Sequence, residues 1–281
     1  MGASTTVLTC EELIQITPDA PKVSALSDLW TSRYLLWILV WRDVKVRYKQ
    51  TVLGAAWAIL QPLLTMVVFT LVFDRVAHIS SGAVPYPLFV LCGLLPWQFF
   101  SSGLVRASNS LVESRYLLTK VPIPRILLPV SAVLSGAPDF GVALTLLLGV
   151  MMYYGIWPSL HGFFILPLVF AVALASLSIG LFLAALHVRY RDIGYVIPFF
   201  AQLMFFVTPV AYPISLVPQR WAFLYKVNPM TSVVEACRYA IIGREEAGWL
   251  AILASTALLG TLLIASFWYF RRMEGTFADV V

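Results

Sequence analysis

The sequence predicts an all-α integral membrane protein with six transmembrane helices. Of its 281 residues, 60% are hydrophobic and only 12% are charged, and the mean hydropathy is +0.86. An ordinary soluble domain carries about 25% charged residues. The few charges are also clustered, which leaves long apolar stretches between them. This composition excludes a soluble globular domain.

Long stretches without Asp, Glu, Lys or Arg mark the spans, because one helix needs about 20 apolar residues to cross the bilayer core. They are Gln50 to Phe73, Val76 to Val105, Ile126 to Pro138, Phe140 to Val188, Ile193 to Gln219 and Ala247 to Phe270. The fourth is too long for one helix, and "GIWPSLHG" (Gly155 to Gly162) supplies turn residues that divide it. Its first half joins the preceding stretch across Asp139. A transmembrane domain over 50–270 is therefore expected, with spans at about 51–75, 86–109, 126–153, 163–186, 194–216 and 248–270.

The distribution of Lys and Arg orients these spans, because cations concentrate in short cytoplasmic loops. Fourteen of the 19 Lys and Arg residues fall on the side that holds both termini, and five fall on the other. We therefore expect cytoplasmic tails at 1–28 and 271–281. The first 28 residues lack a continuous apolar core and do not resemble a cleavable signal peptide. This asymmetry also accounts for the net charge of +5, so nucleic-acid binding is not indicated.

Residues 29–49 precede the first span and are expected to form an amphipathic helix at the cytoplasmic membrane interface. Helical spacing relates Trp30, Tyr34, Trp37, Trp41, Val44 and Tyr48. Arg42, Lys45 and Lys49 fall largely on another face. Aromatic residues on one face and cations on the other suit the headgroup region. A plain positively charged flank that only sets the topology is the alternative.

Two polar features interrupt the apolar spans. Pro62, after Gln61, removes a backbone hydrogen bond within the first span, so the helix should kink there. Trp57 and Gln61 share a face, which fits either a pore wall or simple helix packing. Asp139 is the one carboxylate near the middle of the membrane. Such residues usually face a bundle interior or a cavity, although Asp139 could simply bond to a neighbouring helix.

The connections between spans contain two further predicted elements. "NSLVESRYLLTKVPIPR" (Asn109 to Arg125) mixes charges with leucines and ends in "PIP", which predicts a short helix followed by a rigid elbow. A solvated loop is the alternative. On the other side, Asn228 and Pro229 mark a helix start and Gly243 a helix end. Glu235 and Arg238, three residues apart, can pair on that helix.

Metal and nucleotide sites are not indicated. The three cysteines fall in different topological zones, and the three histidines are too scattered for a metal or catalytic pair. The chain contains no GxxxxGK[ST] phosphate-binding loop, so any ATP hydrolysis would require another chain.

Four blocks of sequence, in the same order, resemble the ABC-2 type permeases that export bacterial cell-surface polysaccharides. They are "RDVKVRYKQTVLGAAWAILQPLLTMVVFTLVF" (Arg42 to Phe73), "GLLPWQFFSSGLVRASNSLVESRYLLTKVPIPRILLP" (Gly93 to Pro129), "VRYRDIGYVIPFFAQLMFFVTPVAYP" (Val188 to Pro213) and "NPMTSVVEACRYAI" (Asn228 to Ile241). Together they cover most of the chain beyond residue 30.

The resemblance implies a homodimer in the bacterial inner membrane, paired with two copies of a cytoplasmic ABC ATPase that binds ATP and Mg²⁺. This chain would then be a transport subunit rather than an enzyme, without a cofactor of its own. Its cargo would be a lipid-linked polysaccharide, with O-antigen preferred over capsule and teichoic acid. The alternatives are an exporter of a drug or small lipid with the same fold, or an ion-coupled carrier or membrane-embedded enzyme. A carrier would usually need several intramembrane ionisable groups, and only Asp139 qualifies; an enzyme would need a cluster of acids, His or Cys at one depth, which the sequence does not show.

The resemblance also suggests roles for particular residues. The ATPase-coupling segment would comprise Glu113, Arg115, Tyr116, Leu117 and Lys120. The outer mouth would be closed by a pair of short re-entrant helices before the last span, with gate candidates Asn228, Pro229, Glu235 and Arg238.

Contacts with the substrate are assigned by its chemistry. The basic helix would guide an anionic lipid headgroup toward the first span through Arg42, Lys45 and Arg47. Each such cation near anionic headgroups is worth about 1 kcal/mol. Because aromatic rings pack on the C–H faces of sugars, we expect a glycan channel lined by Trp57, Gln61, Phe69, Phe73, Trp97, Phe99, Phe100, Phe206 and Tyr212.

Overall fold

The computed structural model describes residues 30–49, 56–78, 84–120, 123–157, 160–243 and 249–275, and all regular elements in these ranges are helical. The predicted all-α class is therefore confirmed. Five helical stretches are long and apolar enough to cross a membrane, at Ala56–Val76, Tyr86–Glu113, Leu127–Tyr153, Gly162–Arg189 and Ile252–Glu274. The predicted N-terminal tail lies outside the described residues.

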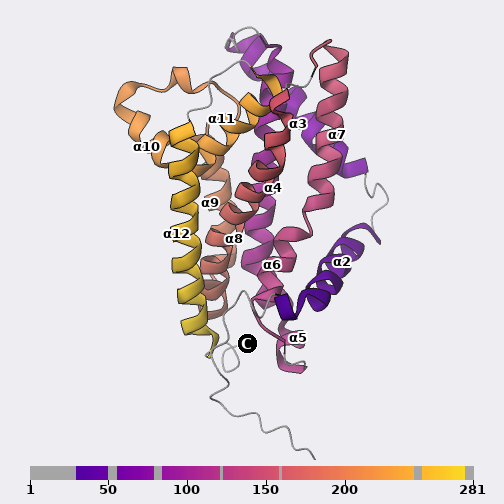
Figure 1. Cartoon of the computed structure of the whole chain (residues 1–281), viewed down its shortest axis with the longest axis vertical. Helices are drawn as coiled ribbons and strands as arrows, with labels where there is room; N and C mark the ends of the chain where they lie inside the picture. Colours follow the sequence, from indigo (N-terminus) through magenta and orange to yellow (C-terminus); the bar gives the residue numbers. More distant parts are fainter. Residues whose placement is uncertain are drawn as a thin grey trace, which may run out of the picture.

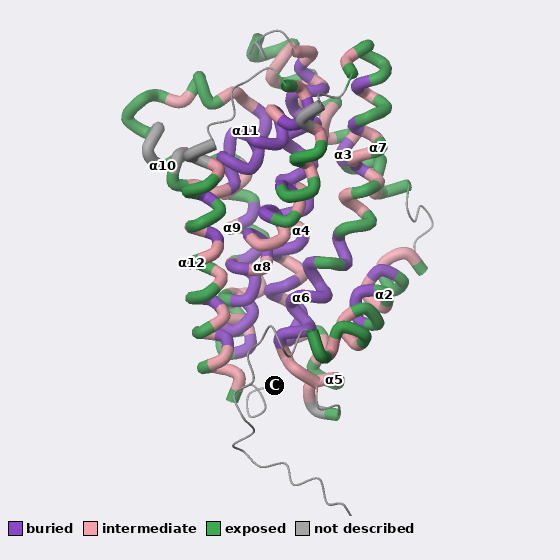
Figure 2. The backbone as a smooth tube through the Cα atoms, in the orientation of Figure 1, coloured by how far each residue is buried: buried purple, intermediate pink, exposed green. Residues whose placement is uncertain are grey.

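The helices form a bundle around α4 (Tyr86–Glu113) and α8 (Ile165–Arg189), which pack extensively against each other (Figure 1). The other main helices are α2 (Arg33–Lys49), α3 (Ala56–Phe69), α6 (Leu127–Leu134), α7 (Ala137–Tyr153), α9 (Ile193–Val207), α11 (Pro229–Ile242) and α12 (Trp249–Glu274). Buried residues concentrate on α4, α6, α8 and α11, whereas α3 and α12 expose much of their apolar surface (Figure 2). That exposed surface suits contact with lipid or with another chain.

Small residues allow α4 and α8 to approach closely. A Cβ atom added at Gly180 would lie 2.7 Å from the Cβ of Ala107, and one at Gly103 would lie 3.1 Å from Ser176. Ser176 also donates a hydrogen bond to the carbonyl of Phe100 at 3.2 Å. Helices in membranes associate through such close contacts because lipid provides no hydrophobic drive between them.

Two predicted spans are interrupted in ways that the apolar pattern did not indicate. The span predicted at 126–153 consists of α6 and α7, separated by a turn at Ser135 and Gly136. The helix in the span predicted at 194–216 is shorter than the span, because α9 ends at Val207 and Thr208 is extended. Pro209 follows at once and has no N–H with which to continue the helix. The 15 residues of α9 fall short of the roughly 20 that a full crossing requires.

The first span also departs from expectation. Residues 51–55 lie outside the described part of the chain, and α3 continues through Pro62 to Phe69. The irregular segment lies further along, where Thr70–Val76 forms a π-helix, η1. The last span extends beyond residue 270, because α12 continues to Glu274 and includes the basic pair Arg271 and Arg272.

Candidate functional site

A cavity of about 1130 Å³ lies among α3, α4, α7 and α9, beside the end of α2. Its wall combines rings, amides, hydroxyls and charges. The aromatic lining residues are Tyr48, Trp57, Trp97, Phe99, Phe140, Phe205 and Phe206, and the polar or charged ones are Arg47, Gln61, Gln98, Ser101, Ser102, Arg106, Asp139 and Gln202. The site is therefore amphipathic, unlike a purely apolar groove between helices.

The rings of the wall are held by neighbouring rings. Trp97 meets Phe205 edge-on, with the ring centroids 5.7 Å apart, and Phe69 stacks on Phe205 from behind at 5.5 Å. Phe99 contacts Phe140 at 5.6 Å. Such offset and edge-to-face pairs fix ring orientation. The aromatic side chains of the wall are therefore held in place by ring–ring contacts.

Five of the nine predicted channel residues line this cavity: Trp57, Gln61, Trp97, Phe99 and Phe206. The other four lie elsewhere. Phe100 is buried behind Trp97, and Phe69 and Phe73 pack against the core. Tyr212 donates to the carbonyl of Phe206 at 2.6 Å and pairs with the Tyr225 hydroxyl at 2.9 Å. Spacing along one chain could not separate residues that face the cavity from those that support it.

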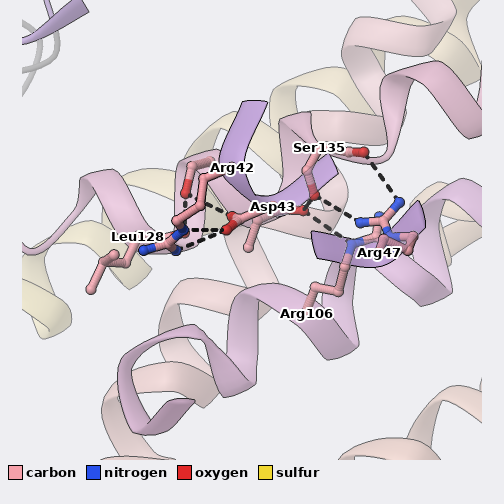
Figure 3. A network of polar contacts seen from close by, with 8 residues as sticks. Arg42, Asp43, Arg47, Arg106, Leu128 and Ser135 are labelled. Atoms are coloured by element: carbon pink, nitrogen blue, oxygen red, sulfur yellow. Dashed lines mark hydrogen bonds and ion pairs between the residues drawn. The ribbon is translucent and has the colours of Figure 1, made fainter. Parts of the chain in front are cut away.

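Asp139 connects the cavity wall to α2. The Arg47 guanidinium and the Tyr48 hydroxyl both donate to its carboxylate. Arg47 also donates to Ser135, to the carbonyl at 3.2 Å and to the hydroxyl at 3.0 Å, as seen in Figure 3. The sequence left two roles open for Asp139, lining a cavity and bonding to a neighbouring helix, and the structure shows both. These bonds dock α2 on the break between α6 and α7.

A second ion pair lies one turn earlier on α2 (Figure 3). Arg42 pairs with Asp43 at 2.8 Å, and the Ser131 hydroxyl donates to the other Asp43 oxygen at 3.4 Å. Lys45 lies over the Trp41 ring at 5.6 Å. Of the three predicted headgroup cations, Arg42 and Arg47 are therefore engaged in ion pairs within the chain.

The predicted aromatic face of α2 is present, but Val44 and Lys45 depart from the predicted division. Val44 is buried with Leu39 and Val40, because this stripe packs against α6. The aromatic residues Trp30, Tyr34, Trp37 and Trp41 are exposed, and Lys45 shares their face through its contact with Trp41. Tertiary contact with α6 selects the buried stripe, and the aromatic residues form the outer surface.

Arg106, which is not among the predicted site residues, also belongs to the site. It lies on α4, lines the cavity, and its Nε donates to the carbonyl of Ala132 at 3.1 Å. Its position inside the span predicted at 86–109 was the available signal. A cation within an apolar span usually faces a cavity or a partner.

At the other end of the bundle, α11 is tied to the end of α9. Asn228 caps the Met230 N–H at 3.0 Å and donates to the Thr208 hydroxyl at 2.9 Å, and Pro229 begins the helix. Gly243 ends it with a left-handed φ of 70°. The predicted helix start and end are therefore confirmed.

The predicted pair on α11 is also confirmed, with Arg238 and Glu235 2.7 Å apart. Arg238 is 2% exposed and also donates to the carbonyls of Pro209 and Val210, at 2.8 and 2.7 Å. The predicted outer gate residues thus surround the point at which α9 ends. Three short elements precede α11 on this side: the 3₁₀ turns η3 (Ile214–Leu216) and η4 (Gln219–Trp221), and α10 (Ala222–Val227).

The predicted coupling segment forms a separate short helix, α5 (Arg115–Lys120), while Glu113 is the last residue of α4. Leu117 packs against a cluster that includes α2 and α12 residues, whereas Tyr116 is 73% exposed and lies under Lys120. Figure 1 shows α5 at the opposite end of the bundle from α10 and α11, near the end of α12. The predicted coupling segment and the predicted outer gate residues therefore lie at opposite ends of the bundle.

Comparison with known proteins agrees with this geometry. The ABC-2 type transporter family model matches residues 34–242. The O-antigen export system permease protein RfbA of Myxococcus xanthus is 32% identical over 92% of this chain and 100% of its own length. A Klebsiella pneumoniae protein of the same name is 26% identical over 88% of this chain and 95% of its own. The polysialic acid transport protein KpsM of Escherichia coli is 25% identical over 72% of this chain and 78% of its own. This chain belongs to the ABC-2 type transporter family.

Proposed function

We propose that this chain is the membrane permease subunit of an ATP-driven exporter that moves lipid-linked O-antigen polysaccharide across the bacterial inner membrane. The observation that carries the proposal is the cavity among α3, α4, α7 and α9, whose wall presents rings beside amides and hydroxyls. The similar O-antigen export permeases from Myxococcus xanthus and Klebsiella pneumoniae support polysaccharide as cargo.

This wall suits a sliding sugar chain. Trp97 and Phe206 offer faces on which pyranose C–H groups pack, and Gln61, Gln98 and Gln202 offer both donors and acceptors to hydroxyls. Contacts of this kind are individually weak, so one sugar unit can leave as the next arrives. An exporter of a small apolar drug would not need three amides in its cavity wall, which favours the polysaccharide over the drug.

The remaining parts of the proposal concern assembly. Two copies of this chain pair with two copies of a cytoplasmic ABC ATPase, which binds ATP and Mg²⁺. The ATPase docks at α5, whose Tyr116 is exposed and whose Leu117 contacts the bundle. The apolar surface of α3 supports pairing with a second copy or with lipid. At the opposite end α11, held by Asn228 and Arg238, caps the conduit.

Residues on α2 guide the lipid headgroup from the cytoplasmic leaflet. Lys45, stacked on Trp41 at the exposed surface, is the cation best placed to meet headgroups first. Arg42 and Arg47 follow it, and each would exchange a carboxylate partner within the chain for the headgroup anion.

The proposal is tested by complementation of a strain that lacks its O-antigen permease, with this chain and its ATPase supplied together. Surface polysaccharide should be restored by the wild-type chain and strongly reduced by Trp97→Ala combined with Phe206→Ala. Phe163→Ala, which removes a ring that is 84% exposed away from the cavity, is the matched control and should export normally. Resistance to toxic drugs without surface polysaccharide would establish the drug exporter instead.

Six spans with both termini in the cytoplasm are also proposed, with α9 and the segment after it completing the fifth crossing. Cysteines introduced at Ser81, Ser159 and Gln219 should react with an impermeant thiol reagent added to intact cells. Cysteines at Ser4 and Asp279 should react only after the cells are permeabilised. Labelling of the terminal sites in intact cells would reject this topology.

A further inference from the structure

The cavity wall carries more positive than negative charge. Among the described residues that line it, the ionisable acids and bases apart from tyrosine are Arg47, Arg106 and Asp139. Asp139 is bonded to Arg47 and to Tyr48. The second cation, Arg106, is repelled by Arg47 and attracted by Asp43, which lies outside the lining and pairs with Arg42. One positive charge of this wall therefore has no carboxylate of its own in the lining.

Arg106 is also incompletely hydrogen-bonded. Its Nε donates to the Ala132 carbonyl at 3.1 Å, but its Nη2 is buried and has no hydrogen-bond partner among the described residues. A guanidinium has five N–H donors, and a buried donor left without an acceptor is costly. The side chain therefore keeps unused hydrogen-bonding capacity at the edge of the cavity that it lines.

The position of Arg106 is defined by its neighbours. A Cβ atom added at Gly136 would lie 2.3 Å from Nη2 and 3.1 Å from the Phe99 ring. Gly136, in the turn between α6 and α7, has no side chain, and the Arg106 guanidinium occupies the space that a side chain would fill. Ser135 of the same turn accepts hydrogen bonds from Arg47 at its hydroxyl and at its carbonyl. One turn therefore places both arginines at the cavity.

We infer that Arg106 and Arg47 form a binding site for a lipid-attached phosphate within the cavity. Planar guanidinium groups match phosphate oxygens bidentately and stay charged at any physiological pH. A neutral sugar would leave the surplus charge uncompensated, whereas a phosphate supplies several acceptor oxygens together with negative charge. This inference rests on the proposed function, since it names the part of the lipid-linked substrate that the two arginines hold.

A polyprenyl diphosphate carrier and an anionic phospholipid could both provide such a phosphate, so the test includes both. The purified full chain, in nanodiscs of phosphatidylcholine, is titrated with a polyprenyl diphosphate, with phosphatidylglycerol or with the uncharged polyprenol. Trp57 and Trp97 line the cavity, so quenching of tryptophan fluorescence reports occupancy. The diphosphate should bind at least tenfold more tightly than the polyprenol.

Variants then assign the site. Arg106→Gln should weaken phosphate-lipid binding about tenfold or more, the factor expected for one lost charge-assisted hydrogen bond. Arg106→Lys, which keeps the charge but not the fork of donors, should lose less, and it guards against a misfolded Gln variant. Arg189→Gln, at an exposed arginine at the end of α8, is the matched control and should bind as the wild type does.

Each outcome decides the inference. Preference for the diphosphate over phosphatidylglycerol, lost in Arg106→Gln, supports the site with the carrier as its source. Equal binding of both phosphate lipids, again lost in Arg106→Gln, supports the site with membrane phospholipid as its source. Binding that Arg106→Gln and Arg106→Lys leave unchanged, or that is no tighter than for the polyprenol, overturns it. Because this assay needs no export, failure of polysaccharide export in cells would reject the proposed function without touching this result.

Discussion

Arg238→Met tests how α11 is held on the end of α9. The guanidinium is 2% exposed and makes three polar contacts: with Glu235 at 2.7 Å and with the carbonyls of Pro209 and Val210 at 2.8 and 2.7 Å. It also lies 3.8 Å from the centroid of the Phe89 ring on α4. Met has a similar length and keeps the apolar contact, so the substitution removes mainly the polar ones.

The expected cost follows from these contacts. Removing one partner of a buried, hydrogen-bonded ion pair typically costs about 3 to 5 kcal/mol. Side-chain hydrogen bonds within membranes average only about 0.6 kcal/mol each, but here two carbonyls and a carboxylate lose their donor together. Glu235 has a side chain that is 25% exposed and recovers some hydration. We therefore expect a loss of about 3 kcal/mol in the free energy of unfolding, near the lower end of that range.

The measurement is the unfolding equilibrium of the purified protein in mixed micelles with increasing dodecyl sulfate, followed by tryptophan fluorescence. Glu235→Gln should cost clearly less, because Arg238 keeps its bonds to Pro209 and Val210. Arg220→Met, at a cation in the short turn η4 whose contact is with the Trp221 ring, is the control and should be near neutral. A loss below about 1 kcal/mol in Arg238→Met would refute the reasoning that this arginine anchors α11.

Three further predictions concern packing, coupling and the α2 contact. Gly180→Ala should destabilise the chain by about 1 to 3 kcal/mol in the same assay, because its Cβ would lie 2.7 Å from that of Ala107. Gly260→Ala, with open space around it, is the control and should be neutral or slightly stabilising. Equal effects of the two substitutions would contradict the packing argument. Leu117→Pro should break α5 and abolish export while membrane insertion is retained, so normal export would reject the coupling role. Arg47→Asp and Asp139→Arg should each impair export, and the double variant with exchanged charges should recover part of the lost export. A double variant that exports no better than either single variant would show that the pair does not act as a unit.

The apolar spans were predictable because each is a local property of composition. Hydrocarbon accepts only long runs of apolar residues in helices. The stretches over 86–109 and 163–186 therefore correspond closely to Tyr86–Glu113 and Ile165–Arg189. Caps are equally local, which is why Asn228 and Gly243 marked the ends of α11 correctly.

The interruptions were less predictable because their cause lies in other elements. Ser135, Gly136 and Pro138 are weak turn signals within a long apolar stretch. The break between α6 and α7 also depends on hydrogen bonds from Arg47 of α2 and on packing of Arg106 from α4. Likewise, α9 ends at Val207. The carbonyls of Pro209 and Val210, which follow, accept hydrogen bonds from Arg238 of α11.

The sequence by itself determined the class of molecule, the approximate place of most spans and the resemblance to a transporter family, since composition and short-range order carry that information. Tertiary structure decided which side chains share one cavity. Aromatic residues at similar spacing divide into the wall at Trp97 and the supporting core at Phe100, and Arg106 changes from a loop cation to a cavity residue. The reason is physical: a cavity is formed by residues from four or more elements, and their relative rotation depends on long-range packing that no local pattern records.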